Sequence, residues 1–447
     1  MRVAQEAALW VLQQLRTHGY TAYFVGGCVR DLLLGASPQD YDVATSAHPD
    51  QVMSLFPNTI AVGAQFGVVL VVVDEESGGA TAPIQVEVAT YRSDVGYSDG
   101  RHPDAVRYSQ TPQEDVKRRD FTVNGLLLDP LRNEILDYVG GRSDLERKLI
   151  RAIGDPRRRF REDKLRMMRA VRFASRLEYE IEPNTMAAIC ELANEIHQVS
   201  RERIRDELDK MLTEGHARHC FELLDQTGLL VEVLPEVSAL KGVEQPPQFH
   251  PEGDVWIHTL LLLDGLEKDC SRSLAWGVLL HDIGKPATFR LAPDRIRFDQ
   301  HAEVGTRMAE QICRRLRFSN DVSEQIAMLV ANHMRFGDVK KMKESTLKRF
   351  MRLPQFDEHL ELHRLDCSAS HRDLSIYEYV RAKLENTPQE QIRPTPLITG
   401  RDLIEHGWKP GPQFRTVLAA VEDAQLEGVL HTREEAMSFV ENNFDKQ

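Results

Sequence analysis

The chain has 447 residues, 42% of them hydrophobic and 28% charged, which predicts about two to four globular domains and excludes a disordered protein. No apolar run approaches the roughly 20 residues of a membrane-spanning helix, so we expect no membrane partner. The six cysteines are scattered without a CxxC pair, as in a reduced, cytoplasmic protein. The net charge of −13 argues weakly against a nucleic-acid partner, although the distribution of charge matters more than its sum.

Short strand and helix patterns alternate through the first 150 residues. Helical spacing covers residues 1–18, and strands are predicted at 23–25, 41–44, 67–73 and 84–88. The strand at 67–73 is an unbroken apolar run, which predicts burial on both faces, whereas 84–88 alternates and predicts one wet face. This part of the chain is therefore predicted to be α+β.

Helical periodicity dominates beyond about residue 158, and helices are predicted at 160–176, 183–196 and about 201–214. Proline-rich stretches near 235–252 and 387–396 indicate boundaries. We therefore predict a head over 1–150, a helical neck over 151–235, a helical domain over 236–386 and a C-terminal helical tail over 387–447.

Residues 151–176 form a basic stretch, with ten Lys or Arg against three Asp or Glu. One interpretation is a solvated helix face with i,i+4 ion pairs. The other is a surface that binds phosphates.

Two glycines, Gly26 and Gly27, follow the predicted strand 23–25 and precede Arg30. Glycine lets the backbone approach a ligand closely, and a helix that begins there offers free amides to a triphosphate. Arg30 adds a bidentate phosphate donor. Farther along, Asp40 and Asp42 stand two residues apart, so on a strand their carboxylates point to one face. Like charges held together usually bind a divalent cation, and Mg²⁺ bridging to substrate phosphates fits best.

In this order and spacing, the two motifs resemble the head of the DNA polymerase β-like nucleotidyltransferase superfamily. They are most similar to its class II branch of tRNA CCA-adding enzymes, A-adding enzymes and poly(A) polymerases. The resemblance implies a head with a short mixed sheet and helices, followed by an all-α body. It also implies Asp40 and Asp42 as catalytic Mg²⁺ ligands, nucleotide contacts from Gly26, Gly27 and Arg30, and tRNA, CTP and ATP as substrates.

Two further stretches resemble motifs of the same family. Lys117–Asn124 is similar to the RRDFTxN element, in which Arg119 is expected to contact the nucleotide. Glu162–Phe173 is similar to the nucleotide-selecting EDxxR helix, which implies that Asp163 and Arg166, neighbours on one helical face, read the Watson–Crick edge of the base. An Asp acceptor and an Arg donor match the edges of both cytosine and adenine. Arg169 and Arg172 are further implied ligand contacts; an ordinary ion pair is the alternative for Asp163 and Arg166.

Three other features fit the resemblance. The polar stretch from Thr90 to Pro103 resembles the family's flexible loop that helps to switch from C to A addition. Glu87 is a candidate third carboxylate that activates the tRNA 3′-hydroxyl, or else a satisfied edge-strand acid. The stretches 397–403 and 407–412 resemble the family's tail, which contacts the tRNA elbow.

A second constellation lies between residues 250 and 370. His258, the pair His281-Asp282 and Asp366 resemble the metal ligands of an HD phosphohydrolase domain, with Mg, Mn, Ni or Co as the candidate metal. Two later histidines, His301 and His333, are candidates for a second metal site. The domain is then either an accessory phosphohydrolase, acting on 2′,3′-cyclic phosphates of tRNA ends, or a packing module.

The resemblance implies template-independent addition of CCA to the tRNA 3′ end from CTP and ATP, by in-line attack of the 3′-hydroxyl on the α-phosphate with release of pyrophosphate. Poly(A) polymerases usually carry Gly-Arg-Arg-Phe after the metal strand, and the corresponding stretch Val62–Gly67 lacks arginine, which disfavours poly(A) synthesis. An A-adding enzyme remains an alternative. An alternative of a different class is an HD phosphohydrolase with a binding-only head. The sequence is compatible with a monomer and with a homodimer.

Overall fold

The computed structural model describes residues 2–63, 67–74, 83–95, 105–248 and 250–445. The chain forms two compact units, Met1–Pro235 and Glu236–Gln447, and each is described by itself. No helix within the described residues is long and apolar enough to cross a membrane. All six cysteines are free thiols.

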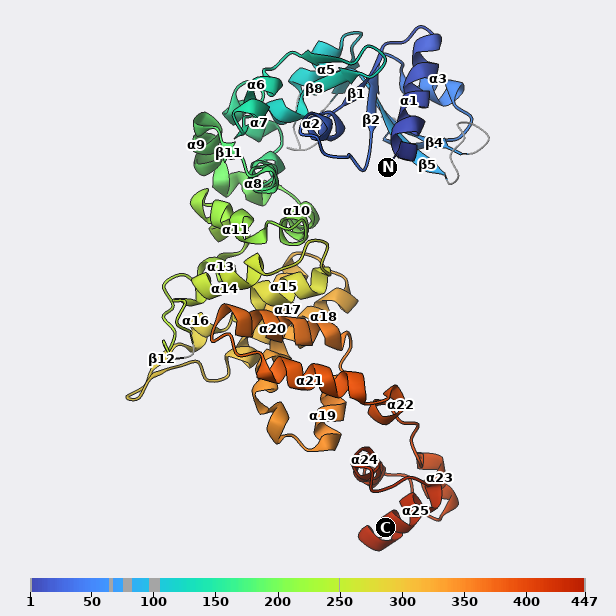
Figure 1. The fold of residues 1–447 in the computed structure, drawn as a ribbon, viewed down its shortest axis with the longest axis vertical. Helices are drawn as coiled ribbons and strands as arrows, with labels where there is room; N and C mark the ends of the chain where they lie inside the picture. The colour runs from blue at the N-terminus through green and yellow to red at the C-terminus, as the bar shows by residue number, and fades with distance from the viewer. Residues whose placement is uncertain (1, 64–66, 75–82, 96–104, 249, 446–447) are drawn as a thin grey trace. The chain divides into compact units, whose positions relative to one another are not determined.

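A seven-stranded mixed sheet is the centre of the first unit, with strand order β3-β4-β5-β2-β1-β8-β9 (Figure 1). Its strands are β1 (Ala22–Val25), β2 (Asp42–Thr45), β3 (Thr59–Gly63), β4 (Val68–Val73), β5 (Ile84–Thr90), β8 (Leu126–Asp129) and β9 (Glu134–Asp137). Strands β2 and β5 run parallel, whereas the other neighbours in this sheet are antiparallel. The sheet confirms the predicted α+β head.

Helices flank this sheet and short elements follow it. They are α1 (Arg2–Thr17), α2 (Gly27–Leu33), α3 (Pro49–Leu55), α5 (Pro112–Lys117), the 3-10 helix η2 (Thr122–Asn124) and α6 (Gly141–Glu146). A separate antiparallel pair consists of β6 (Arg92–Val95) and β7 (Ala105–Tyr108), and a short parallel pair of β10 (Leu149–Ile150) and β11 (Glu180–Ile181).

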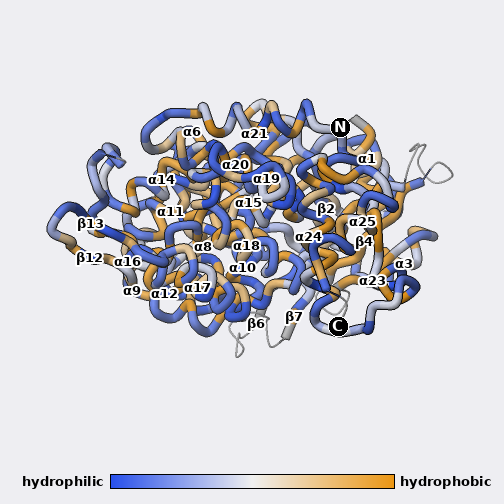
Figure 2. The backbone as a smooth tube through the Cα atoms, turned by 90° about the horizontal axis from the view of Figure 1, so that it is seen from below, coloured by the Kyte–Doolittle hydropathy of each residue, from blue (hydrophilic) through white to orange (hydrophobic). Residues whose placement is uncertain are grey.

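The burial of β4 differs from the prediction. Its residues are all apolar, and they appear orange in Figure 2, yet they alternate between buried and half-buried. The expectation of burial on both faces was wrong, because β4 lies one strand from the edge of the sheet and one of its faces is only partly covered. The predicted alternation of β5 is confirmed: Val86 and Val88 are buried and Gln85 and Glu87 are exposed.

The rest of the first unit is helical: α7 (Pro156–Glu162), α8 (Leu165–Leu177), α9 (Pro183–Leu192), the 3-10 helix η3 (Ala193–Gln198), α10 (Arg201–Thr213), α11 (Ala217–Gln226) and α12 (Leu229–Val233). The single helix predicted at 160–176 is wrong. The backbone leaves helical geometry at Asp163 (φ −148°, ψ 105°), whose carboxylate accepts a hydrogen bond from the Leu165 N–H at 3.1 Å. This bond satisfies the N–H of Leu165, the first residue of α8, whose N-cap position is Lys164. The helix predicted at 183–196 ends at Leu192 and continues as 3-10 turns.

The second unit is a helical domain with a small C-terminal cluster. Its helices are α13 (Pro235–Ser238, which begins at the boundary), α14 (Val255–Asp264), α15 (Arg272–Leu280), α16 (Lys285–Thr288), α17 (His301–Arg315), α18 (Asn320–Asn332), the 3-10 helix η4 (His333–Lys341), α19 (Glu344–Met351), α20 (Phe356–Ala369), α21 (Ser375–Asn386), α22 (Gln389–Ile392), α23 (Gly400–Glu405), α24 (Gln413–Leu426) and α25 (Arg433–Asn443). A short hairpin of β12 (Arg290–Leu291) and β13 (Ile296–Arg297) precedes α17. Helices α23 to α25 have an apolar core of their own around Leu403, Trp408 and Val417. This helical body confirms the predicted fold class.

Candidate functional site

Three acids approach one another at the end of the head sheet. Asp42 opens β2 opposite Val25 of β1, and the parallel pairing of β2 with β5 brings Glu87 beside it. Asp40 is exposed and precedes the strand, so the expectation that both aspartates lie on a strand was wrong for Asp40. Burial, followed by the like charges of Glu87 and Asp40, raises the pKa of Asp42 to about 6, although Arg119 partly offsets this rise. A hard divalent cation such as Mg²⁺ would relieve the repulsion, so these carboxylates fit the predicted metal.

The glycine turn before this site packs against the second head motif. Gly26 has φ 75°, in the left-handed region that favours glycine. A β-carbon at Gly26 would lie 3.2 Å from Nη1 of Arg119. Arg119 donates from Nη2 to Asp115 at 3.2 Å, and its buried Nε has no hydrogen-bond partner among the described residues. Two motifs more than 90 residues apart therefore meet beside Asp42.

Arg30 lies inside the head rather than on its surface. Only 2% of the residue is exposed, and it donates to Asn124 Oδ1 and to Asp31 Oδ1, both at 2.8 Å. The hydrogen bond to Asn124 links α2 to η2, which ends the RRDFTxN element. Since its N–H groups already have protein acceptors, its phosphate contact stays a prediction.

The neck carries the predicted base-reading residues, but their partners differ from the expected ones. Asp163 accepts a bidentate pair from Arg203 of α10, at 3.1 and 2.7 Å. Arg166 donates instead to Glu162 at 3.0 Å and to the Arg118 carbonyl oxygen at 3.1 Å. The expectation that Asp163 and Arg166 share one helical face was wrong, because the helix breaks between them.

The two other predicted ligand arginines of α8 also bind acids. Arg169 holds Asp120 of the head with two hydrogen bonds, at 2.9 and 2.7 Å. Arg172 donates from Nε to Glu207 of α10 at 2.7 Å. These two guanidiniums lie 5.2 and 4.5 Å from the centre of the Phe173 ring, and that of Arg30 lies 5.5 Å away. The ring therefore helps to accommodate three cations where the head meets the neck.

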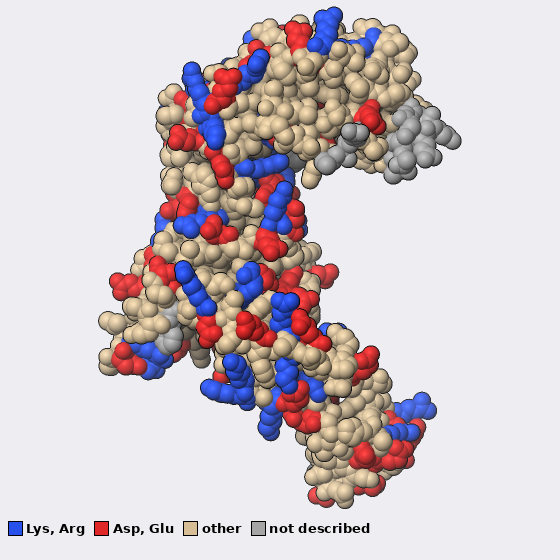
Figure 3. Space-filling view, in the orientation of Figure 1, with Lys and Arg blue, Asp and Glu red and all other residues tan. Residues whose placement is uncertain are grey.

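Acidic partners also offset much of the basic stretch at 151–176. Arg157 pairs with Glu191 at 2.7 Å, Arg159 with Glu162 at 2.7 Å, and Arg176 lies 3.9 Å from Glu214. Blue and red side chains are interspersed on the face shown in Figure 3. Acids therefore offset much of the charge, but two of these three pairs join residues more than 30 positions apart and none has the predicted i,i+4 spacing.

Part of the predicted flexible loop lies outside the described residues. Strands β6 and β7 flank residues 96–104, which the structure does not describe. Residues 64–66, within the stretch compared with the poly(A) polymerase motif, also lie outside the described residues.

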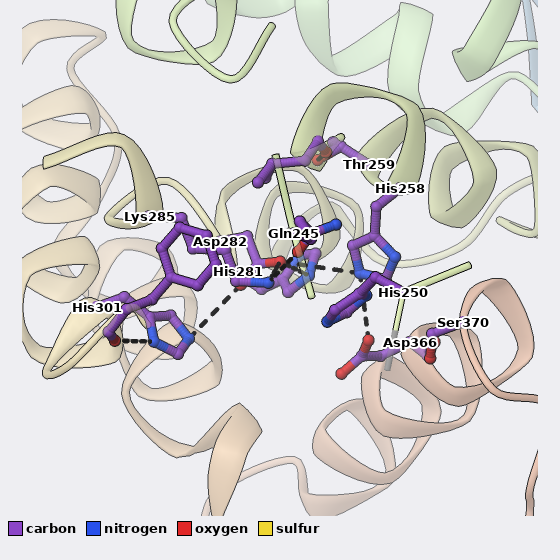
Figure 4. A network of polar contacts seen from close by, with 12 residues as sticks. Gln245, His250, His258, Thr259, His281, Asp282, Lys285, His301, Asp366 and Ser370 are labelled. Atoms are coloured by element: carbon purple, nitrogen blue, oxygen red, sulfur yellow. Dashed lines mark hydrogen bonds and ion pairs between the residues drawn. The ribbon is translucent and has the colours of Figure 1, made fainter. Parts of the chain in front are cut away.

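A buried cluster of histidines and aspartates occupies the helical domain (Figure 4). His258 comes from α14, His281 and Asp282 follow α15, and Asp366 comes from α20. Nε2 of His258 lies 3.2 Å from Asp366 Oδ1, and Nε2 of His281 lies 3.2 Å from Asp282 Oδ2. The ligand atoms of His258, His281 and Asp366 lie within 4.8 Å of one another. The structure thus brings the four predicted HD residues together.

Asp282 faces a second group of histidines through its other oxygen. Its Oδ1 lies 3.6 Å from His301 Nε2 and 3.8 Å from His333 Nε2. On the Oδ2 side, Lys285 Nζ lies 2.7 Å away. Burial opposes ionisation of Asp282, but His281 and Lys285 overcome it and hold the pKa of Asp282 well below its usual range. A carboxylate between two histidine groups matches the two predicted metal positions.

Donor chemistry and packing in this cluster suit a divalent metal. Nε2 of His258 and of His281 is buried and makes no hydrogen bond of normal geometry within the described part of the chain, although each lies near a carboxylate. Burial opposes charging His258, yet the neighbouring carboxylates of Asp366 and Glu252 raise its pKa to about 9. Burial and the neighbouring His281 lower the pKa of His333 to about 4.

A β-carbon at Gly284 would lie 2.2 Å from the His301 carbonyl oxygen, so α16 and α17 meet closely only with glycine there.

Sequence reasoning missed two residues of these sites, Arg203 and Glu252. Arg203 lies 40 positions from Asp163, and no local pattern connects them. Glu252 lies in the proline-rich stretch whose composition indicates a boundary, and it accepts a hydrogen bond from His258 Nδ1 at 2.7 Å. The spacing of Glu252 and His258 carries no motif that would have identified it.

Three family models match the chain. Residues 22–151 match the poly A polymerase head domain, residues 178–241 the probable RNA- and SrmB-binding site of polymerase A, and residues 254–371 the HD domain.

Curated relatives and solved structures agree with these matches. The CCA-adding enzyme of Geobacillus stearothermophilus is 45% identical over 229 residues, covering 51% of this chain and 54% of that protein. The one from Lactobacillus helveticus is 42% identical over 270 residues, covering 59% and 65%. The matches thus span between half and two thirds of these relatives.

Among solved structures, the Bacillus stearothermophilus CCA-adding enzyme in complex with CTP has a TM-score of 0.73 and 29% identity, covering 99% of this chain and 98% of that one. The Thermotoga maritima CCA-adding enzyme complexed with tRNA has the same fold, with a TM-score of 0.60, 18% identity, and coverage of 99% and 98%. The chain therefore carries a poly A polymerase head domain and an HD domain, and it is similar over nearly its whole length to a CCA-adding enzyme.

Proposed function

We propose that the chain is a template-independent tRNA nucleotidyltransferase that adds CCA to the tRNA 3′ end from CTP and ATP, with release of pyrophosphate. The observation that carries the proposal is the meeting of Asp42, Glu87 and Arg119 beside the Gly26 turn. The 29% identical relative with CTP, which matches over almost its whole length, supports the same reaction. Such an enzyme would work in the cytoplasm, where its substrates are.

In this proposal the head acids organise the reacting groups. Asp40 and Asp42 would hold Mg²⁺, which supplies positive charge against the reacting phosphates. Glu87, beside Asp42, would accept the proton of the tRNA 3′-hydroxyl. Arg119, next to the Gly26 backbone, would hold the nucleotide phosphates in line for attack.

Base selection is assigned to Asp163, Arg166 and Arg203. The pair from Arg203 fixes the plane of the Asp163 carboxylate, and Oδ2, which accepts only from Arg203, retains acceptor capacity. Cytosine and adenine both present an amino donor that this carboxylate can accept, and both present a ring nitrogen that suits the Arg166 donor. UTP and GTP present a carbonyl where the amino group should be, so the same pair would reject them.

The test offers purified protein, Mg²⁺, CTP and ATP to tRNAs that end at the discriminator base, at C and at CC. Extension of all three to CCA is expected. Growth from the CC end alone would identify an A-adding enzyme, and long adenosine tails would identify a poly(A) polymerase. No incorporation on any substrate, with intact phosphohydrolase activity, would favour a binding-only head.

A second candidate function is a metal-dependent phosphohydrolase in the HD domain. The buried Nε2 atoms of His258 and His281 converge with Asp366 but lack normal hydrogen bonds to the described residues, which favours this function over a packing role. The test measures hydrolysis of a 2′,3′-cyclic phosphate with Mg²⁺, Mn²⁺, Ni²⁺ or Co²⁺. No hydrolysis and no metal binding would leave the domain as a packing module.

A further inference from the structure

Each of the four histidines in the HD cluster presents Nε2 to the cluster, but one differs in what holds its other nitrogen. Nδ1 of His281, His301 and His333 lies 2.8, 2.9 and 2.6 Å from a carbonyl oxygen three residues earlier in the chain. A carbonyl oxygen can only accept, so in each ring Nδ1 carries a proton, and a neutral ring then has its lone pair on Nε2. The Nε2 atoms of His301 and His333 lie 3.2 Å from each other.

His258 is held by a side chain instead. It lies in the first turn of α14, and the carbonyl three residues before it, that of Val255, accepts from the Thr259 hydroxyl at 2.8 Å. Its Nδ1 lies 2.7 Å from Oε1 of Glu252, a side chain that is 7% exposed. The ring of His250 lies beside that of His258 (Figure 4), with 4.9 Å between the ring centres. Nδ1 of His250 lies 2.9 Å from the same oxygen of Glu252.

We infer that Glu252 is a positioning residue of the HD metal site, which fixes the Nδ1–H tautomer and the ring orientation of His258 so that Nε2 faces the metal. The inference rests on the proposed HD function. A carboxylate partner also makes the imidazole a stronger ligand than a carbonyl partner does, and removal of such a partner typically weakens metal binding by about 10- to 100-fold.

Geometry separates this role from simple packing. Oε1 of Glu252 contacts the rings of His250 and His258, whereas its Oε2 is buried without a hydrogen bond to any described residue. A carboxylate kept in that state stabilises the chain little by itself. Through Oε1 it holds the ring of His258, whose other nitrogen lies 3.2 Å from Asp366.

The test compares wild type, Glu252→Gln and the matched control His250→Gln, which removes the other partner of the same oxygen. Co²⁺ binding, followed by visible absorption of the full chain, should be about 10- to 100-fold weaker in Glu252→Gln and within about threefold of wild type in His250→Gln. In the metal-free protein, at a pH where the His258 ring is neutral, long-range ¹H–¹⁵N NMR should find the His258 proton on Nδ1 in wild type and a mixture of tautomers in Glu252→Gln.

Two results would overturn the inference and are distinguishable. If wild type binds Co²⁺ and Glu252→Gln binds it equally well with the proton still on Nδ1, the inference fails while the HD site stands. If wild type binds no Co²⁺ at all, the HD proposal fails as well. Circular dichroism of both variants ensures that weak binding does not reflect unfolding.

Discussion

Replacing Asp42 by asparagine should stabilise the metal-free head at neutral pH while abolishing its use of Mg²⁺. The pKa of Asp42 is raised from 3.8 to about 6, which corresponds to about 3 kcal/mol of disfavoured ionisation. Because the residue is only half-buried and the surroundings relax, we expect Asp42→Asn to raise the free energy of unfolding of the metal-free head by about 1–3 kcal/mol. Folding favours the protonated carboxyl. The free energies of unfolding of wild type and variant should therefore match near pH 4 and diverge as the pH rises from 4 through 6.

Hydrogen exchange of the β2 and β5 amides, followed by mass spectrometry in EDTA, reports the opening free energy of this part of the head alone. The Asp42→Asn variant should exchange more slowly than wild type at pH 8, with a smaller difference at pH 5. Added Mg²⁺ with CTP should slow exchange in wild type only. The control Asp50→Asn, at an exposed site in α3, should change neither quantity. Equal protection of wild type and Asp42→Asn at pH 8 would refute the like-charge reasoning.

Three other changes test the sites separately. Gly26→Ala should destabilise the head by about 1–3 kcal/mol and reduce incorporation, because φ is 75° and the new methyl group would lie 3.2 Å from Arg119; unchanged melting of the head would contradict this. Arg203→Ala should relax base choice by freeing the Asp163 carboxylate, measured as the ratio of UTP to CTP incorporation, and an unaltered ratio would remove it from base selection. His281→Ala should abolish phosphohydrolase activity and leave CCA synthesis intact, as scored by parallel assays on one preparation; loss of both would indicate a folding defect.

Much of the head was predictable because its motifs are local. The strand before Gly26, the strand that Asp42 opens and the alternating strand that bears Glu87 each follow from residue patterns within a few positions. The break at Asp163 was not predictable in this way. Helical periodicity continues through it, and only the backbone at Asp163 reveals that α7 ends there and that its side chain accepts from the first N–H of α8.

The partners of the site residues were the part that sequence could not supply. Arg169 reaches Asp120 across 49 positions, and Asp163 meets Arg203 across 40. Such pairs depend on how helices pack, which leaves no spacing rule in the chain. The HD residues, by contrast, were identified because His281 and Asp282 are adjacent at a helix end, whereas their support from Glu252 was missed.

The parallel pairing of β2 with β5 has a consequence for the order in which the head can form. Asp42 and Glu87 are neighbours because β5 pairs with both β4 and β2, and strands β3 and β4 lie between β2 and β5 in the sequence. Closing such a loop costs entropy before any contact repays it. Arg119, whose charge moderates the repulsion, lies farther along the chain than both acids. A nascent head should complete its sheet late, and nucleotide or metal binding should favour the finished form over earlier intermediates.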